Sequence, residues 1–208
     1  MLGLLTRRRW PRPATRPHSV RLALEALETR DLMAAPVITS FTATTLPGHI
    51  ARLTGTVTDE NPGSVTITFT GAVSASTTVN PAGSFSFSTT DAVLGVVHAK
   101  ALDNQGLYSA IVDATLANSK PVITNFTAVR GSGGFWTFSG KVTDQSQTTC
   151  SVAFSGLPEL EGKTATVAAD GSFYLVVWIP AGTQGTAIAV ATDEWNLTSE
   201  EAAAIVRA

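Results

Sequence analysis

The sequence predicts an all-β protein with two tandem β-sandwich modules after a short N-terminal leader. An eight-residue block, Pro36–Ala43, recurs as Pro121–Ala128 with seven identical residues, at an offset of 85. After residue 35, apolar residues alternate with threonine and serine, and turn-forming residues interrupt this alternation. Two copies of about 85 residues can each bury a core, so the repeat indicates tandem domains rather than a solenoid.

The repeat continues along both copies. Matched positions, first copy before second, are Gly55/Gly140, Val57/Val142, Asp59/Asp144, Gly83/Gly171, Phe85/Phe173, Asp103/Asp193, Leu107/Leu197 and Ser109/Ser199. The offset grows from 85 to 88, which places an insertion of three residues near residues 157–162, and it reaches 90 at Asp103/Asp193. Fixed blocks separated by small insertions indicate a framework joined by loops. The first module is therefore assigned to residues 36–118 and the second to 119–208.

Seven strands are predicted in each copy. Those of the first lie at residues 36–43, 51–59, 65–71, 75–79, 84–89, 96–102 and 108–116. In the third, Val65, Ile67 and Phe69 alternate with threonines, which is typical of a half-buried strand in an antiparallel sheet. Seven short strands in about 85 residues are the pattern of an immunoglobulin-like sandwich. A barrel of similar strand count is the alternative.

Three motifs in fixed order carry a resemblance to a known class of module. Gly-x-Val-x-Asp is followed by a Gly-Ser-Phe turn and then by Ala-x-Asp-x-x-(Gly/Asn)-Leu-x-Ser, in both copies. This order resembles bacterial immunoglobulin-like surface modules and covers residues 36–208. The resemblance implies the sandwich fold but no single function, because such domains serve as spacers, adhesins and appendages of enzymes.

Residues 1–35 differ in composition from the rest of the chain. They contain seven arginines and three acidic residues, whereas the remaining residues contain seven basic and thirteen acidic ones. Arg7–Arg12 leads into a proline-rich stretch that cannot bury a core, so a disordered leader is predicted. A twin-arginine pattern is present, but the apolar segment that a conventional signal peptide requires does not follow it.

The end of the leader carries a second resemblance. Leu24-Glu-Ala-Leu-Glu-Thr-Arg30, followed by Leu32-Met33 and two alanines, is similar to the LEPR-XLL-like N-terminal motif of planctomycete surface proteins. That resemblance implies an export or surface-sorting tag, and hence a secreted or cell-surface protein. The alternative is a short amphipathic helix that packs on the first domain through its leucines.

The sequence argues against catalysis and against nucleic-acid binding. After residue 35 it has two histidines, His49 and His98, and neither lies near a catalytic serine, cysteine or metal motif. The acidic modules disfavour nucleic acid. Cys150, the only cysteine, aligns with the inward Val65, so a buried thiol is expected, with an interdomain disulfide or a reactive thiol as the alternative. No run reaches the length of a transmembrane helix.

We therefore expect a non-catalytic binding or structural module without a cofactor, which contacts a protein or a cell-surface polysaccharide. One alternative is a calcium-rigidified, cadherin-like adhesion module, since Asp59, Glu60 and Asp103 lie at predicted turns and calcium prefers oxygen ligands. Asp144 and Asp193 keep part of this pattern in the second copy. The other alternative is a carbohydrate-binding accessory protein.

A candidate contact patch follows from the alternation in the second copy. Ser84, Ser86 and Ser88 are the expected outward residues of one strand in the first copy, whereas the second copy has Ser172 and then a cluster of large side chains. If the two partner strands pair antiparallel, Phe135 lies near the end of that cluster. The predicted patch consists of Phe135, Tyr174, Val176 and Trp178. The alternatives are a bulge that reverses the register, or burial against the leader or a neighbouring loop.

Overall fold

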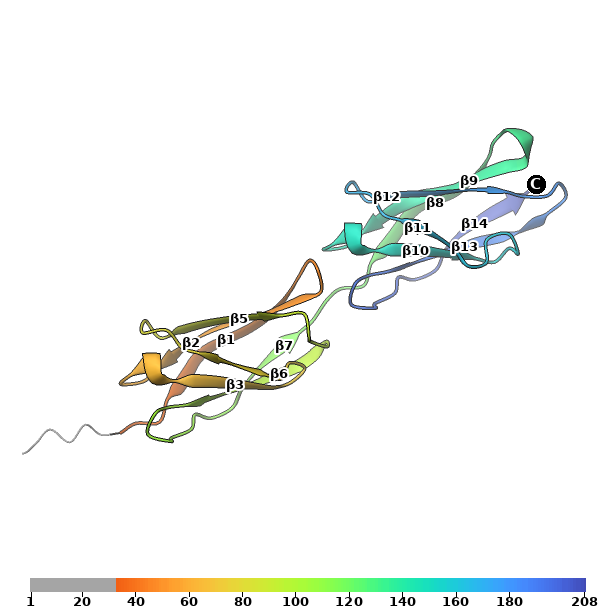
Figure 1. Cartoon of the computed structure of the whole chain (residues 1–208). Coiled ribbons are helices and arrows are strands. Elements are labelled where there is room, and N and C mark those ends of the chain that lie inside the picture. Colours follow the sequence, from red (N-terminus) through yellow and green to blue (C-terminus); the bar gives the residue numbers. More distant parts are fainter. Residues whose placement is uncertain (1–32) are drawn as a thin grey trace, which may run out of the picture. The chain divides into compact units, whose positions relative to one another are not determined.

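The apolar alternation along the chain produces fourteen strands in a computed structural model that describes residues 33–208 (Figure 1). Of the predicted leader, residues 1–32 lie outside the described part. The strands of the first copy are β1 (Val37–Leu46), β2 (Ile50–Thr58), β3 (Thr66–Gly71), β4 (Ala75–Thr78), β5 (Ser84–Thr89), β6 (Gly95–Leu102) and β7 (Val112–Leu116). Those of the second are β8 (Val122–Arg130), β9 (Phe135–Thr143), β10 (Ser151–Ser155), β11 (Lys163–Thr166), β12 (Ser172–Trp178), β13 (Gln184–Thr192) and β14 (Ala202–Arg207).

Each copy is a sandwich of two antiparallel sheets. In the first copy a three-stranded sheet has the order β1-β2-β5, and a four-stranded sheet has the order β4-β3-β6-β7. The second copy repeats this arrangement as β8-β9-β12 and β11-β10-β13-β14. The fold class is thus the predicted one, two tandem immunoglobulin-like sandwiches of seven strands each. The barrel alternative is wrong, because each copy divides into two separate sheets.

Short 3₁₀ turns connect several strands: Pro62–Ser64, Ser132–Gly134 and Gln147–Thr149. A β-bulge interrupts the first strand of each copy, between Ile38 and Ser40 in β1 and between Thr124 and Thr127 in β8. Asn125 in the second bulge adopts a left-handed conformation with φ 54°, which asparagine tolerates better than most residues. After this bulge, Thr127 to Arg130 of β8 pair in regular register with Ser139 to Trp136 of β9. The outward residues of β9 are therefore the predicted ones.

The residues that recur between the copies are those that build the core. Phe41, Phe69 and Phe85 pack together in the first sandwich, with ring centroids 5.8 to 6.2 Å apart. Their counterparts Phe126, Phe154 and Phe173 form the same cluster in the second, at 6.1 to 6.2 Å. Such aromatic clusters supply much of the buried apolar area of a small sandwich. The sequence repeat therefore marks the structural framework.

Most strand ends of the first copy lie within three residues of the prediction, but two features of the structure differ further. The seventh strand begins at Val112 rather than at residue 108, and Tyr108 forms only an isolated bridge to Leu102. The insertion near residues 157–162 is also more than a solvated loop, because Leu157 and Leu160 are buried in the second core. Glu161 in this insertion accepts a hydrogen bond from the Gly156 N–H at 3.2 Å, so it orders the turn that carries the two leucines.

Candidate contact surface

The outward face of the sheet β8-β9-β12 carries the largest exposed apolar side chains of the second sandwich. Phe135, Tyr174, Val176 and Trp178 are 51%, 71%, 51% and 52% exposed, respectively. They alternate with buried residues of the same strands, such as Phe138 on β9 and Phe173 on β12. Period-two alternation places all four on the same side of the sheet.

Strand pairing brings the four residues together in adjacent rows. Trp178 lies opposite Phe135, and the next outward row pairs Val176 with Thr137 and Val129. A third row pairs Tyr174 with Ser139 and Thr127. Directly opposite side chains on one face of a sheet are about 4.5–5.5 Å apart at Cβ, and diagonal neighbours in adjacent rows, about 7–8 Å apart, are within reach of aromatic side chains, so these rows form a continuous surface. We call it the aromatic face, defined by Val129, Phe135, Tyr174, Val176 and Trp178.

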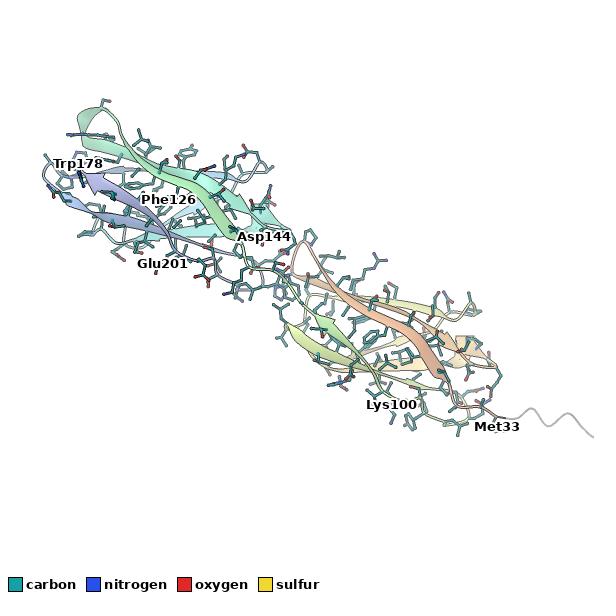
Figure 2. The ribbon with its side chains drawn as sticks, turned by 180° about the vertical axis from the view of Figure 1, so that it is seen from behind. Met33, Lys100, Phe126, Asp144, Trp178 and Glu201 are labelled. Carbon is teal, nitrogen blue, oxygen red and sulfur yellow. The ribbon has the colours of Figure 1, made fainter. Side chains whose placement is uncertain are left out.

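The indole of Trp178 is held at one edge by the β8–β9 hairpin. A Cβ atom added to Gly134 would lie 2.8 Å from Trp178 Nε1, so the glycine provides the space that the ring occupies. Gly134 also has φ +82°, a conformation that favours glycine. Figure 2 shows Trp178 at the opposite end of the second sandwich from Asp144. The ring is therefore preorganised at the hairpin end of the aromatic face.

The first copy has no aromatic side chain in the equivalent rows, and one of these rows consists of hydroxyl residues alone. Ser86, Thr54 and Thr42 occupy the row that corresponds to Tyr174, Ser139 and Thr127. Thr42 and Thr54 are hydrogen-bonded to each other through their Oγ1 atoms at 2.8 Å. Because this sheet forms without aromatic residues on its outer side, the fold does not require the aromatic face of the second copy.

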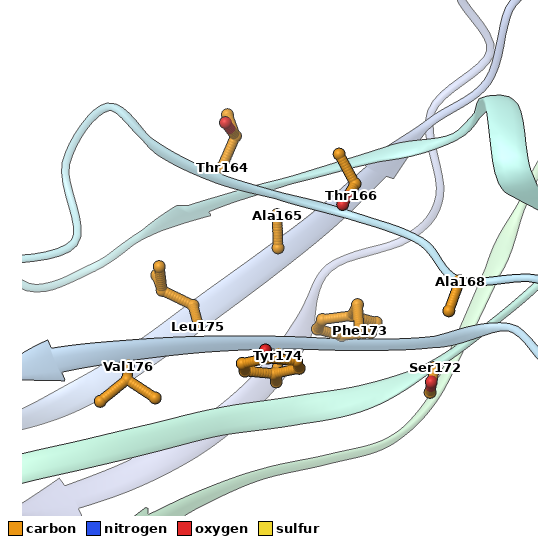
Figure 3. Close-up of a pocket in the computed structure, with 9 residues that line it drawn as sticks. All are labelled: Thr164, Ala165, Thr166, Ala168, Ser172, Phe173, Tyr174, Leu175 and Val176. Atoms are coloured by element: carbon orange, nitrogen blue, oxygen red, sulfur yellow. The ribbon is translucent and has the colours of Figure 1, made fainter.

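A hollow of 520 Å³ adjoins the aromatic face. It lies between the edge strands β11 and β12, and Figure 3 shows Phe173, Leu175 and Ala165 between these strands, with Tyr174 and Val176 on the other side of β12. Thr164, Thr166 and Ser172 also line it. This hollow leaves no signal in the sequence, because β11 and β12 belong to different sheets and no local pattern shows that two such strands are neighbours.

The polar end of the aromatic face carries two opposite charges. Lys141 pairs with Ser172 across the strands, and Ser172 donates to Asp170 Oδ1 through both its hydroxyl (2.6 Å) and its N–H (2.9 Å). These hydrogen bonds, with the hydroxyl contributing most and the Lys141 charge less, lower the pKa of Asp170 below its usual value. The carboxylate therefore stays ionised beside Lys141, and the apolar part of the face itself is uncharged.

The aspartates of the calcium alternative serve the turns. Asp103 Oδ1 accepts hydrogen bonds from the N–H groups of Gln105 and Leu107, and Asp193 Oδ1 accepts from those of Trp195 and Leu197. Asp59 accepts from the Asn61 N–H. This is the usual role of aspartate at a turn. Within residues 33–208, no three histidine, cysteine or acidic side chains are grouped so that they could hold a metal ion.

The cysteine and the two histidines of the modules lie apart from the aromatic face and from one another. Cys150 is buried, and burial together with the negative charges of Asp144, Asp193 and Glu194 raises the pKa of its thiol to about 12. His98 lies on the outer face of β6 and bonds to Asp113 at 2.7 Å, with both side chains partly exposed. His49 lies in the β1–β2 turn and contacts the second copy. In the described part of the chain, no helix is long and apolar enough to cross a membrane.

Comparisons with known proteins give similarity in solved structures only. No family model and no curated protein matches the chain. A structure of fibronectin(III)-like modules of Clostridium thermocellum CbhA is 16% identical, with 83% of this chain and 93% of that chain covered and a TM-score of 0.35. A two-domain fibronectin type-III segment of chicken tenascin is 14% identical, with 82% and 96% covered and a TM-score of 0.36.

An eight-domain immunoglobulin structure of Down Syndrome Cell Adhesion Molecule is 12% identical, with a TM-score of 0.38. The alignment covers 85% of this chain but only 28% of that one. At these identities and TM-scores, the similarities say nothing of a ligand or partner for the present chain.

Proposed function

We propose that this protein is a non-catalytic binding and structural module of the cell exterior, and that the aromatic face of its second sandwich is the contact surface. The observation that carries the proposal is the difference between the two copies. Both copies build the same sheet, but only the second places exposed aromatic side chains on its outer side. Contiguous apolar surface that the fold does not need is typical of an interaction site.

The chemistry of the aromatic face fits a partner that offers apolar surface framed by hydrogen-bonding groups. Tyrosine and tryptophan are enriched at contact sites because they give a large area at low entropic cost. Their rings here stand beside the hydroxyl groups of Thr137 and Ser139, and Thr164 and Thr166 line the adjoining hollow. Both a protein and a cell-surface polysaccharide present surfaces of this kind. The mixture of flat rings and hydroxyl groups favours the polysaccharide.

The extracellular location rests on the resemblance of the leader to surface-sorting motifs. Mass spectrometry of the mature protein from its native cells would report both its location and any cleavage near residue 34. We expect the protein in the medium or in the envelope fraction. Recovery of the intact chain from the cytoplasm alone would contradict this part of the proposal.

The contact surface is tested by removing two of its rings. We expect the full-length protein to be retained by insoluble cellulose or chitin, or by envelope material from the cells that produce it. The double variant Tyr174→Ser/Trp178→Ser gives the second copy side chains of the size found in the first. Its retention should fall by about tenfold or more, since a few aromatic residues carry most of the energy of a typical contact.

The matched control is Tyr108→Ser, which removes a similarly exposed tyrosine from the first sandwich. This variant should be retained as well as the wild type. Equal retention of the double variant and the wild type would disprove the proposed surface, and so would the absence of wild-type retention on every one of these materials.

A further inference from the structure

The turn between β13 and β14 of the second sandwich contacts the β1–β2 hairpin of the first. Met33–Ala208 form one compact unit, and within it Trp195 is only 6% exposed and packs with the buried apolar residues of the first sandwich. The residue that corresponds to Trp195 in the first copy is Gln105, which is exposed. The second copy therefore places a tryptophan at a turn where its own core does not bury it.

His49 at the tip of the hairpin provides the other half of this contact. Its imidazole stacks on the Trp195 indole, with ring centroids 4.0 Å apart and an interplanar angle of 18°. His49 Nδ1 lies 2.7 Å from the Glu194 carbonyl oxygen and donates to it, because a carbonyl can only accept. The Gly48 N–H donates to Glu194 Oε2 at 2.9 Å. Stacking and hydrogen bonds thus hold the same two turns together.

The segment between the copies is also fixed to both of them. Asn118 Nδ2 donates to Asp193 Oδ2 at 2.8 Å, and Thr45 Oγ1 donates to the Ala117 carbonyl oxygen at 3.2 Å. The corresponding oxygen of the first copy, Asp103 Oδ2, is buried without a partner within the described residues. The space left among these groups is 20 Å³, room for about one water molecule.

We infer that these contacts form a rigid joint which holds the two sandwiches in one relative orientation. Short polar linkers between domains normally permit relative motion, unless a packed interface restrains the domains. Here the domains are restrained by the buried Trp195, by the charge-assisted hydrogen bond to Glu194, and by the hydrogen bonds that fix the linker to both copies. The joint is independent of the proposed contact surface, since none of the residues that define the aromatic face takes part in these contacts, and Trp178 lies at the end of the second sandwich away from Asp144 (Figure 2).

The joint fits one order of the copies only. The hairpin of the second copy has Gly134 at the position of His49, and the turn of the first copy has Gln105 at the position of Trp195. Neither a second-copy hairpin nor a first-copy turn can therefore form the ring stack. The first copy contributes the hairpin with His49, and the second copy contributes the turn with Trp195.

Backbone ¹⁵N relaxation on the full chain tests the joint. In the wild type, the amides of both sandwiches should report one common tumbling time. Trp195→Gln introduces the residue that the first copy carries at this turn, so the second sandwich should still fold. Each sandwich should then tumble separately, with a tumbling time about twofold shorter, because each module has half the mass of the pair.

His49→Asn removes the imidazole but retains a residue that tolerates the left-handed φ of 57° at this position, and it should have the same effect. Trp178→Ser, which removes a tryptophan far from the joint, should leave the common tumbling time unchanged. Unshifted amide signals in both cores show that each variant is folded. Separate tumbling times in the wild type, or a common tumbling time in folded Trp195→Gln, would overturn the inference.

Discussion

Gly55 and Gly140 occupy equivalent places where a side chain has no room. A Cβ atom on Gly55 would lie 2.3 Å from the Ser40 carbonyl oxygen and 2.5 Å from the Phe85 ring. On Gly140 it would lie 2.8 Å from the Phe173 ring. In both sandwiches the glycine is therefore the position against which the phenylalanine of the Gly-Ser-Phe turn packs. This explains why the two motifs recur together.

We predict that Gly55→Ala and Gly140→Ala each lower the free energy of unfolding by about 1–3 kcal/mol, because the extra methyl group overpacks the core. Chemical denaturation of the full chain would measure this. Gly63→Ala is the matched control: its Cβ would meet Pro81 at 3.4 Å or more, so its effect should stay within about 0.5 kcal/mol. Unchanged stability in Gly55→Ala would show that the phenylalanine repacks freely.

The thiol of Cys150 should be inert in the folded protein. Its pKa is raised to about 12 by burial and by nearby carboxylates, so thiolate is scarce at pH 8. We predict that iodoacetamide labels it only in denaturant. The unfolded chain loses this proton at a lower pH than the folded one, so stability is intact below about pH 9 and falls as the pH rises toward 12. Rapid labelling of the folded protein at pH 8 would contradict the burial.

At the scale of the element, adjacent residues of β12 have opposite roles. Phe173 is buried in the second core, whereas Tyr174 is largely exposed on the aromatic face. We predict that Phe173→Ala lowers the free energy of unfolding by about 3–5 kcal/mol, while Tyr174→Ser changes it by less than about 0.5 kcal/mol. Thermal denaturation would compare the two. A large loss in Tyr174→Ser would mean that the tyrosine supports the fold and is not free for a partner.

The strands and their two faces could be predicted from the sequence, because period-two alternation directly records which side of a strand is buried. The same alternation gave the outward places of Phe135 and Trp178. Two features were beyond this reasoning. Leu157 and Leu160 fill the core from a loop whose sequence has no apolar periodicity. Trp195 stacks on His49 although the two residues are far apart in the sequence. Local sequence pattern carries no signal for such contacts.

At the scale of the whole molecule, the side chains of the joint should make calcium unnecessary for rigidity. Calcium that bound at the joint would stabilise the folded state by about 2.7 kcal/mol at a hundredfold excess over its Kd. We instead predict equal melting temperatures, and one common tumbling time, in millimolar calcium and in excess chelator. A lower melting temperature in chelator, or separate tumbling of the two sandwiches in chelator, would support the calcium-rigidified alternative.

The second sandwich is proposed to contact its partner through the aromatic face. The most direct measurement is an amide chemical-shift map of the full chain, titrated with a soluble envelope extract from the cells that produce it. The extract contains both proteins and polysaccharides, so the map does not depend on which of them binds. We predict that the perturbed amides cluster on β9 and β12 and around the β8–β9 hairpin. A cluster on the first sandwich, or on the inner end of the second near Asp144, would contradict the account.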